Sequence, residues 1–164
     1  DDWVQAADDE SKHFNLMCDC LEAAGSHYGA MPAHAFMWQA AEDTADDFLG
    51  RLAVVPMVLE ARGLDATPQI QERLRAVGSP MALRAVDVLE IILRDEVGHV
   101  AIGTRWFNFC CQARGCDPET TFLDLLQDVG RGALRGPYNA EARRLAGFTP
   151  DEMRGITALA NNAV

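Results

Sequence analysis

Two segments of the chain repeat one polar pattern within apolar helical stripes, and this repeat limits the folds that the chain can adopt. Residues 9–13 and residues 95–99 both read Asp-Glu-x-x-His. Residues three apart on a helix lie on one face, so each Glu and His can bind one metal ion together. The fold must therefore place both Glu and His pairs where their polar groups are neutralised or paired.

The companions of each motif at helical spacing are apolar. Around Glu10 and His13 they are Trp3, Ala6, Phe14, Met17 and Leu21, and around Glu96 and His99 they are Ala85, Leu89, Ile92, Gly103 and Trp106. We therefore expect both motifs to face the core. Burying an ionised carboxylate without a partner is costly, so such a group must be neutralised or paired. A bound cation would meet that need at both motifs.

A third carboxylate, Glu60, lies on another apolar stripe. It shares a helix face with Leu49, Ala53 and Met57. The stripes carry no matching Lys or Arg, which favours a metal site over a network of salt bridges. The predicted metal ligands are Glu10, His13, Glu60, Glu96 and His99. Oxygen and imidazole ligands together favour iron, with manganese or zinc as alternatives.

The aspartates that precede the two motifs have a predicted task as well. Metal-bound histidines usually donate their other ring N–H to a carboxylate, which fixes the tautomer and the ring orientation. In an antiparallel pair of helices, Asp9 could reach His99 and Asp95 could reach His13. The alternative is that both aspartates are ordinary solvent-exposed acids, just as a single Glu-x-x-His is usually a solvated pair.

Apolar residues recur at helical spacing almost everywhere, which predicts an all-α fold. We expect helices over residues 1–24, from Phe36 or Ala41 to Arg62, from Thr67-Pro68 to about Val77 and from Pro80 to about Ala113, then short helices that open at Asp117-Pro118, Asn139 and Thr149-Pro150. Pro56 predicts a kink or bulge inside its helix. The length suits one domain, with metal-binding helices over residues 1–114 and a helical tail over residues 115–164.

The composition argues against several classes of partner. The net charge is −11, and nucleic-acid binding depends largely on Lys and Arg, so nucleic acid is not an expected partner. No apolar run approaches the length of a membrane span. The five cysteines form no C-x-x-C pair, which favours reduced thiols in a cytoplasmic protein.

Three segments resemble an uncharacterised bacterial ferritin-like family, domain of unknown function 455: HYGAMPAH at residues 27–34, VVPMVLEARGLDATP at residues 54–68 and RDEVGHVAIGTRWF at residues 94–107. The two Glu-x-x-His motifs and the lone Glu between them also resemble the ferritin-like dimetal-carboxylate superfamily. The resemblance implies a four-helix bundle with a two-metal centre. It also implies another Glu on a helix before the first motif, which we expect to precede residue 1 in a longer protein. No role is assigned to His27, Tyr28 or His34.

These expectations lead to a functional hypothesis. Two metal ions bridged by carboxylates can react with dioxygen, so we expect an oxygen-dependent oxidase or hydroxylase of a small organic molecule with hydrophobic surface. One alternative is a ferroxidase-type or non-catalytic iron-handling protein, and another is a relative of tRNA-modifying hydroxylases, for which the acidic surface is unsuited. A monomer or homodimer is expected.

Overall fold

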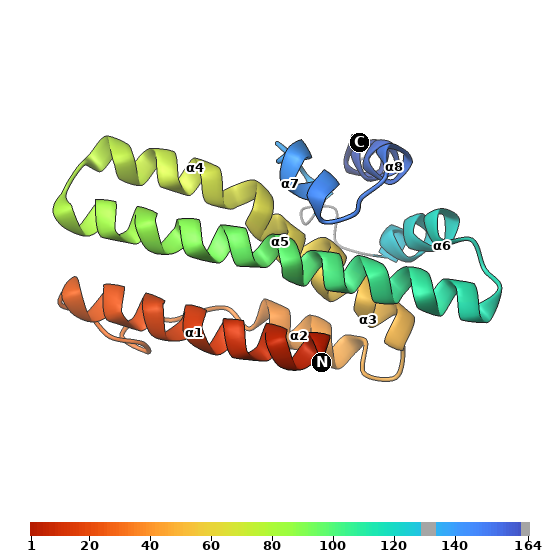
Figure 1. Cartoon of the computed structure of the whole chain (residues 1–164), viewed down its shortest axis with the longest axis horizontal. Coiled ribbons are helices and arrows are strands. Elements are labelled where there is room, and N and C mark those ends of the chain that lie inside the picture. Colours follow the sequence, from red (N-terminus) through yellow and green to blue (C-terminus); the bar gives the residue numbers. More distant parts are fainter. Residues whose placement is uncertain (129–133, 162–164) are drawn as a thin grey trace. The chain divides into compact units, whose positions relative to one another are not determined.

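The computed structural model describes residues 1–128 and 134–161, and these residues form helices and no strand. The all-α prediction is therefore confirmed. The helices are α1 (Asp2–Ala23), α2 (Phe36–Asp43), α3 (Phe48–Val54), η1 (Val55–Glu60), α4 (Ala61–Val77), α5 (Pro80–Arg114), α6 (Pro118–Leu125), η2 (Leu126–Asp128), α7 (Ala140–Leu145) and α8 (Pro150–Asn161) (Figure 1). Across the described ranges, none of these helices has both the length and the apolar character that crossing a bilayer demands.

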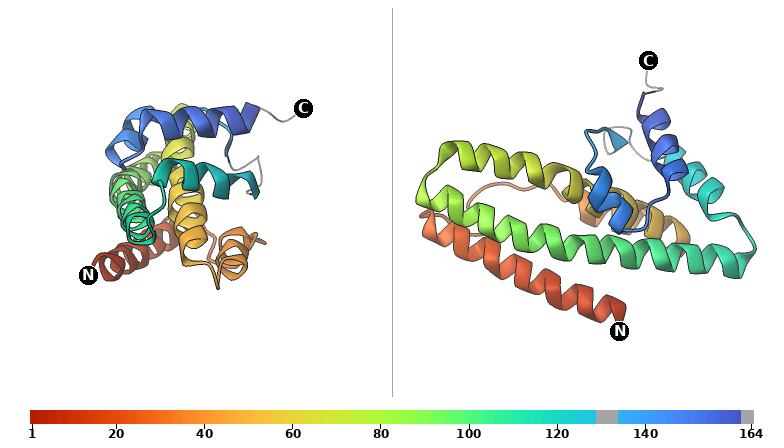
Figure 2. Two further views of the ribbon diagram at one scale, coloured as in Figure 1. Left: turned by 90° about the vertical axis from the view of Figure 1, so that its right-hand side faces the viewer. Right: turned by 45° about the horizontal axis from the view of Figure 1, so that its top comes forward.

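The chain divides into two compact units, one of residues 1–35 and 66–95 and the other of residues 36–65 and 96–164. In the first unit, α1 and the second half of α4 lie along the first half of α5 (Figure 2). In the second unit, α6 contacts both α3 and α8, and α2 contacts α3 and η1. Helix α5 continues without a break from one unit into the other, so residues 95–99 belong to one stretch of regular helix.

Helix α1 buries a different side from the one that its apolar stripe predicts. Trp3, Phe14 and Met17 are 43%, 50% and 39% exposed, so the prediction that they face the core is wrong. Six of the buried and half-buried positions form a line with alternating spacings of four and three residues: Asp2, Ala6, Asp9, His13, Leu16 and Cys20. Cys18 and Leu21 are also half-buried. This line lies one residue earlier along the sequence, about 100° around the helix. The polar contacts of His13 and its neighbour Lys12 with Asp95 are not recorded in a pattern of apolar residues.

The predicted second helix is interrupted where the sequence suggested continuity. Helix α2 ends at Asp43 and α3 begins at Phe48. At Pro56 the helix widens into the π-helical turn η1, which confirms the predicted bulge. Such a turn accommodates a residue that cannot donate to the normal α-helical ladder.

The predicted helix end at Arg62 and the predicted new start at Thr67-Pro68 are both wrong, because α4 runs through them to Val77. Pro68 lacks the N–H that would reach the carbonyl of Leu64 in a regular helix. That carbonyl instead accepts a hydrogen bond of 3.2 Å from the side-chain amide of Asn139. A residue 75 positions away in the sequence thus replaces the missing partner and keeps the helix intact.

Helix α5 pairs with the preceding helices in an antiparallel register. Gln71 donates a hydrogen bond to the carbonyl of Val86, close to the turn between α4 and α5. Farther along, a Cβ added at Gly103 would lie 2.4 Å from the Cβ of Pro56. Only glycine therefore allows η1 to approach α5 this closely. The observed range of α5, Pro80–Arg114, matches the predicted long helix.

In the described part of the tail, the three short α-helices α6, α7 and α8 each begin at a predicted capping residue. Asp117 and Asn139 accept hydrogen bonds from the backbone N–H groups of Thr120 and Ala142. Before α8, the side chains of Thr149 and Glu152 each accept a hydrogen bond from the backbone N–H of the other. This reciprocal pair is a capping box. The aromatic core between these helices and α5 contains Phe107, Phe122 and Phe148 in edge-to-face contacts.

A candidate metal centre

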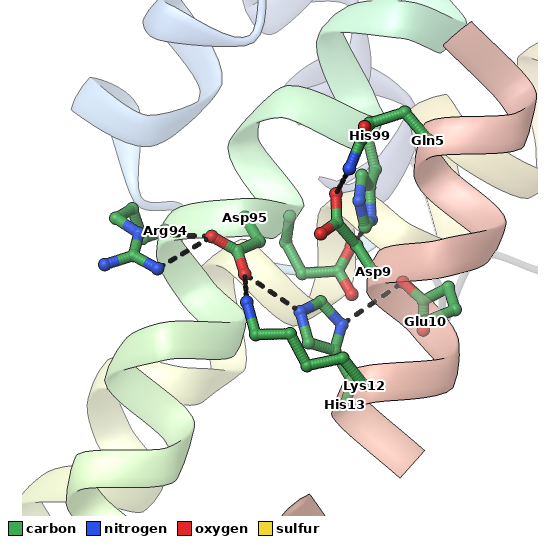
Figure 3. A network of polar contacts seen from close by, with 9 residues as sticks. Gln5, Asp9, Glu10, Lys12, His13, Arg94, Asp95 and His99 are labelled. Atoms are coloured by element: carbon green, nitrogen blue, oxygen red, sulfur yellow. Dashed lines mark hydrogen bonds and ion pairs between the residues drawn. The ribbon is translucent and has the colours of Figure 1, made fainter. Parts of the chain in front are cut away.

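The centre begins with a contact between α1 and α5. His13 is buried, and its Nε2 lies 3.3 Å from Oδ2 of Asp95. Lys12 donates a hydrogen bond of 2.9 Å to the same oxygen, and Arg94 donates two to Oδ1. Figure 3 shows these side chains around the Asp95 carboxylate. The predicted contact of Asp95 with His13 is thereby confirmed.

This environment keeps Asp95 ionised. Burial by itself raises the pKa of the Asp95 carboxyl, but the hydrogen bonds from Lys12, His13 and Arg94 together outweigh burial and lower the pKa to about 2. An ionised carboxylate can only accept hydrogen bonds, so Nε2 of His13 carries the ring proton in this contact. In a neutral imidazole with this tautomer, the other ring nitrogen, Nδ1, presents a lone pair.

That second nitrogen is directed at the first motif's own carboxylate. Nδ1 of His13 is a buried atom and lies 3.4 Å from Oε1 of Glu10 (Figure 3). The Glu10 side chain is 54% exposed. Glu10 therefore approaches the histidine from the solvent side of α1, although the sequence predicted that it faces the core.

The second motif has the same internal geometry on α5. Nδ1 of His99 lies 3.6 Å from Oε2 of Glu96, and the two side chains are 6% and 16% exposed. Both residues follow Asp95 within one helical turn. The predicted burial of this motif is confirmed, and its apolar companions Leu89, Ile92 and Trp106 are all half-buried.

The two motifs together provide a candidate ligand set. One ligand atom from each of Glu10, His13, Glu96 and His99 lies within 4.8 Å of the other three, so this group could hold a metal ion. Four of the five predicted ligands belong to it.

The distances within each motif also suit a shared ion. Two protein ligands about 2.1 Å from one ion stand roughly 3.0 to 3.4 Å apart when they occupy neighbouring coordination positions. The nitrogen-to-oxygen distances of 3.4 Å and 3.6 Å are close to this value. They are longer than the 2.7 to 2.9 Å or so that is typical of a charge-assisted hydrogen bond.

Glu60, the fifth predicted ligand, lies outside the group of four. Its predicted stripe is confirmed, since Ala53 and Met57 are fully buried, and Glu60 itself is half-buried. Pro56 is in register with Gly103 and the helices are antiparallel, so the backbone of Glu60 lies one turn along, level with His99. Its role as a ligand stays a prediction.

The remaining candidates have other surroundings. Asp9 accepts a hydrogen bond of 3.2 Å from Gln5, and its predicted contact with His99 stays a prediction. His27, Tyr28 and His34 are exposed in the segment between α1 and α2. They do not belong to the Glu and His group.

Sequence reasoning missed the two cations that hold Asp95. Lys12 lies inside the first motif and Arg94 directly precedes the second. Their position beside the motif residues could have indicated this contact. A lysine within a Glu-x-x-His segment lies close enough to contact a carboxylate on the helix that packs against it. The sequence does not define which acid that would be.

Comparison with known proteins identifies a family for this chain, and the descriptions of the matches name no activity. The family model described as "Protein of unknown function (DUF455)" matches residues 1–154. A relative from Haemophilus influenzae, described as "Uncharacterized protein", is 44% identical over 155 residues, which cover 94% of this chain and 53% of the relative. The chain thus spans about half the length of this curated relative. No solved structure matches the chain.

Proposed function

The chain belongs to the DUF455 family of proteins of unknown function, and from this premise we propose that it forms a ferritin-like bundle with a dimetal-carboxylate centre that serves an oxygen-dependent oxidase or hydroxylase. The group of Glu10, His13, Glu96 and His99 is the observation that carries the proposal. This group contains both copies of the Glu-x-x-His motif. Its carboxylate and imidazole ligands favour iron, with manganese or zinc as alternatives.

The number of ions follows from the size of the group. Ligands on opposite sides of one ion stand about 4.2 Å apart, so four atoms within 4.8 Å can surround a single ion. A second ion requires further oxygen ligands. Glu60 is in register for this role, and a Glu on a preceding helix, as the superfamily resemblance implies, would supply another. We propose two ions in the complete protein.

The residues around the centre have distinct tasks in this proposal. Asp95 holds the His13 ring with Nε2–H bound and Nδ1 directed toward the ion, while Lys12 and Arg94 keep Asp95 charged and in place. The buried His99 and the shielded Glu96 limit water on the α5 side. When bound, two redox-active ions supply the electrons for a reaction with dioxygen. The exposed side of Glu10 is the access route for a small organic substrate.

Metal content tests the proposal directly. The protein, purified from iron-supplemented cells without chelators, should contain about two metal ions per chain if its ligand set is complete. His99→Gln should lose at least one of them, whereas His27→Gln, the matched control at an exposed histidine, should keep both. Equal metal content in wild type and His99→Gln would refute the metal centre. Dioxygen consumption after anaerobic loading with Fe(II) then tests the oxidase or hydroxylase role.

Iron handling is the second candidate, and the exposure of Glu10 also favours it because an ion could enter and leave there. The two functions differ in turnover. A ferroxidase consumes dioxygen in proportion to added Fe(II) and accumulates iron beyond two ions per chain. An oxidase or hydroxylase keeps its metal content constant and consumes dioxygen only when a reductant and an organic substrate are present.

A further inference from the structure

The C-terminus of α5 places two cysteines side by side. The backbone N–H of Cys116 donates to the carbonyl of Cys111 at 3.0 Å, and the N–H of Gly115 donates to the carbonyl of Gln112 at 3.2 Å. Gly115 has a φ of +69°. These three features define a Schellman motif, in which the residues at the positions of Cys111 and Cys116 usually bring their side chains into contact. Here both residues are cysteines.

The two thiols have different surroundings. Cys111 is fully buried, whereas Cys116 is half-buried, and its thiol donates to the carbonyl of Cys111 at 3.5 Å. Burial, followed by the neighbouring Cys116 thiol, raises the pKa of Cys111 to about 12. Cys111 therefore remains a protonated thiol.

Cys116 is the thiol that a reagent can reach. It lines an open surface pocket of about 720 Å³ at the junction of α5 and α6. The other residues of this pocket are Arg105, Asn108, Phe109, Gln112, Gly115, Asp117 and Pro118. A small polar oxidant can enter a pocket of this size, whereas Cys111 is not among its lining residues.

We propose that Cys111 and Cys116 form a reversible disulfide when hydrogen peroxide oxidises this turn. The Cys116 thiolate attacks one peroxide oxygen, which gives a sulfenic acid and releases hydroxide that takes up a proton to become water. The Cys111 sulfur then attacks the Cys116 sulfur, loses its proton and expels a second water. Two thiols and one peroxide thus give one disulfide and two waters, and a dithiol reductant reverses the change.

The disulfide would lock the junction between α5 and α6. It closes a loop of only six residues, and the Asp117 cap of α6 follows directly, accepting a hydrogen bond of 2.8 Å from Thr120. The gain in global stability should therefore be small, since short loops lose little entropy when they are closed. The same bond should slow hydrogen exchange in the first turn of α6. This device is independent of the metal centre.

The test uses the whole chain and hydrogen peroxide as the probe. After brief treatment with one equivalent, the number of alkylatable thiols in denaturant should fall from five to three. Trypsin cleaves after Arg114, between the two cysteines, so the disulfide should join peptides 106–114 and 115–131 until dithiothreitol separates them. Fragmentation of the joined peptides should place the bond at Cys111 and not at Cys110.

Variants and alternatives complete the test. Cys116→Ser should keep four thiols after treatment, Cys111→Ser should accumulate a sulfenic acid that dimedone labels at Cys116, and Cys20→Ser, the control in α1, should still form the bond. If Cys116→Ser fails to fold, peptide mapping of the wild type alone decides. Five unchanged thiols, a bond at Cys110 or a bond between chains would overturn the proposal.

Discussion

Two clusters of charged and polar side chains in this protein are built in different ways. In the first, Asp65 and Arg143 form a paired salt bridge whose side chains are 2% and 3% exposed. In the second, the Glu and His group of α1 and α5 gathers two carboxylates and two imidazoles. The contrast separates a cluster that supports the fold from one that is suited to bind a ligand.

The Asp65 cluster is complete within the protein. Arg143 donates to both Asp65 oxygens, with distances of 3.0 Å and 2.7 Å, and the backbone N–H of Asn139 adds a third bond at 2.9 Å. The guanidinium also lies over the rings of Tyr138 and Phe148. One negative charge meets one positive charge, so the cluster needs no ion.

The Glu and His group has an excess of acid. With neutral imidazoles its four ligands carry two negative charges, and the nitrogen-to-oxygen distances of 3.4 Å and 3.6 Å are too long for strong hydrogen bonds. Lys12 and Arg94 neutralise Asp95 behind the group. A divalent cation at the centre would balance the remaining charge.

The largest expected effect on stability comes from a change in the Asp65 cluster. Arg143→Met should lower the free energy of unfolding by roughly 3 to 5 kcal/mol, because Asp65 would keep a buried charge without its main partner. Urea unfolding followed by circular dichroism measures this loss. The double variant Asp65→Leu with Arg143→Met should recover much of it, and a double variant as unstable as the single one would contradict this interpretation.

The second effect concerns metal-dependent stability. A metal at 100 times its dissociation constant should stabilise the wild type by about 2.7 kcal/mol. Glu96→Gln should lose this increment while its metal-free form is at least as stable as the metal-free wild type, since one charge of the acidic group is removed. Thermal unfolding with Fe(II), Mn(II) or Zn(II) and with a chelator provides the measurement.

The same experiment separates the two clusters. Arg143→Met should start from a lower melting temperature and still gain the metal-dependent increment, because Arg143 takes no part in the Glu and His group. If Glu96→Gln kept the full increment, the ion would bind elsewhere and the assignment of the group would be wrong.

The two clusters also differ in how far the sequence reveals them. The Glu-x-x-His spacing is local, so each Glu and His pair of the group was predictable from helix geometry alone. Asp65 and Arg143 are 78 residues apart, and nothing in either local sequence specifies the partner. Long-range pairing of this kind depends on tertiary packing.

The errors in the helix predictions have the same origin. Pro68 looked like a helix start, and α4 continues past it because Asn139 binds the carbonyl that Pro68 cannot serve. The side of α1 that is buried was misjudged because its apolar stripe does not record the contacts of Lys12 and His13 with Asp95. In contrast, the caps of the tail helices were predictable, since each depends on residues three positions apart.

A smaller effect is expected where η1 meets α5. Gly103→Ala places a Cβ 2.4 Å from the Cβ of Pro56, so it should cost about 1 to 3 kcal/mol of stability. If Glu60 is a ligand, the displaced η1 should also weaken metal binding. Gly63→Ala is the matched control, because its Cβ meets nothing within 4 Å, and it should stabilise α4 by about 0.5 to 1 kcal/mol. Titration of both variants with metal measures the second effect, and unchanged affinity in a destabilised Gly103→Ala would remove Glu60 from the centre.

The smallest effect tests a buried carboxylate, Glu152, which belongs to neither of the two clusters. Burial, partly offset by the Thr149 hydrogen bonds, raises the pKa of Glu152, so the folded state favours the protonated acid. A raised acid pKa means that ionisation opposes folding, and the penalty grows as the pH rises through the pKa of the unfolded chain and levels off above that of the folded state. Glu152→Gln keeps an acceptor for the N–H of Thr149, so it should raise the melting temperature slightly at neutral pH.

The pH dependence distinguishes this mechanism from simple repacking. The advantage of Glu152→Gln should shrink in acid, where the wild-type side chain is protonated and neutral as well. Glu152→Ala removes the cap and should cost about 1 kcal/mol in acid, where no ionisation penalty offsets the loss. Melting curves of the three proteins at several pH values provide the comparison. A Gln advantage that stayed constant with pH would mean that shape, and not charge, decides the fit of this side chain.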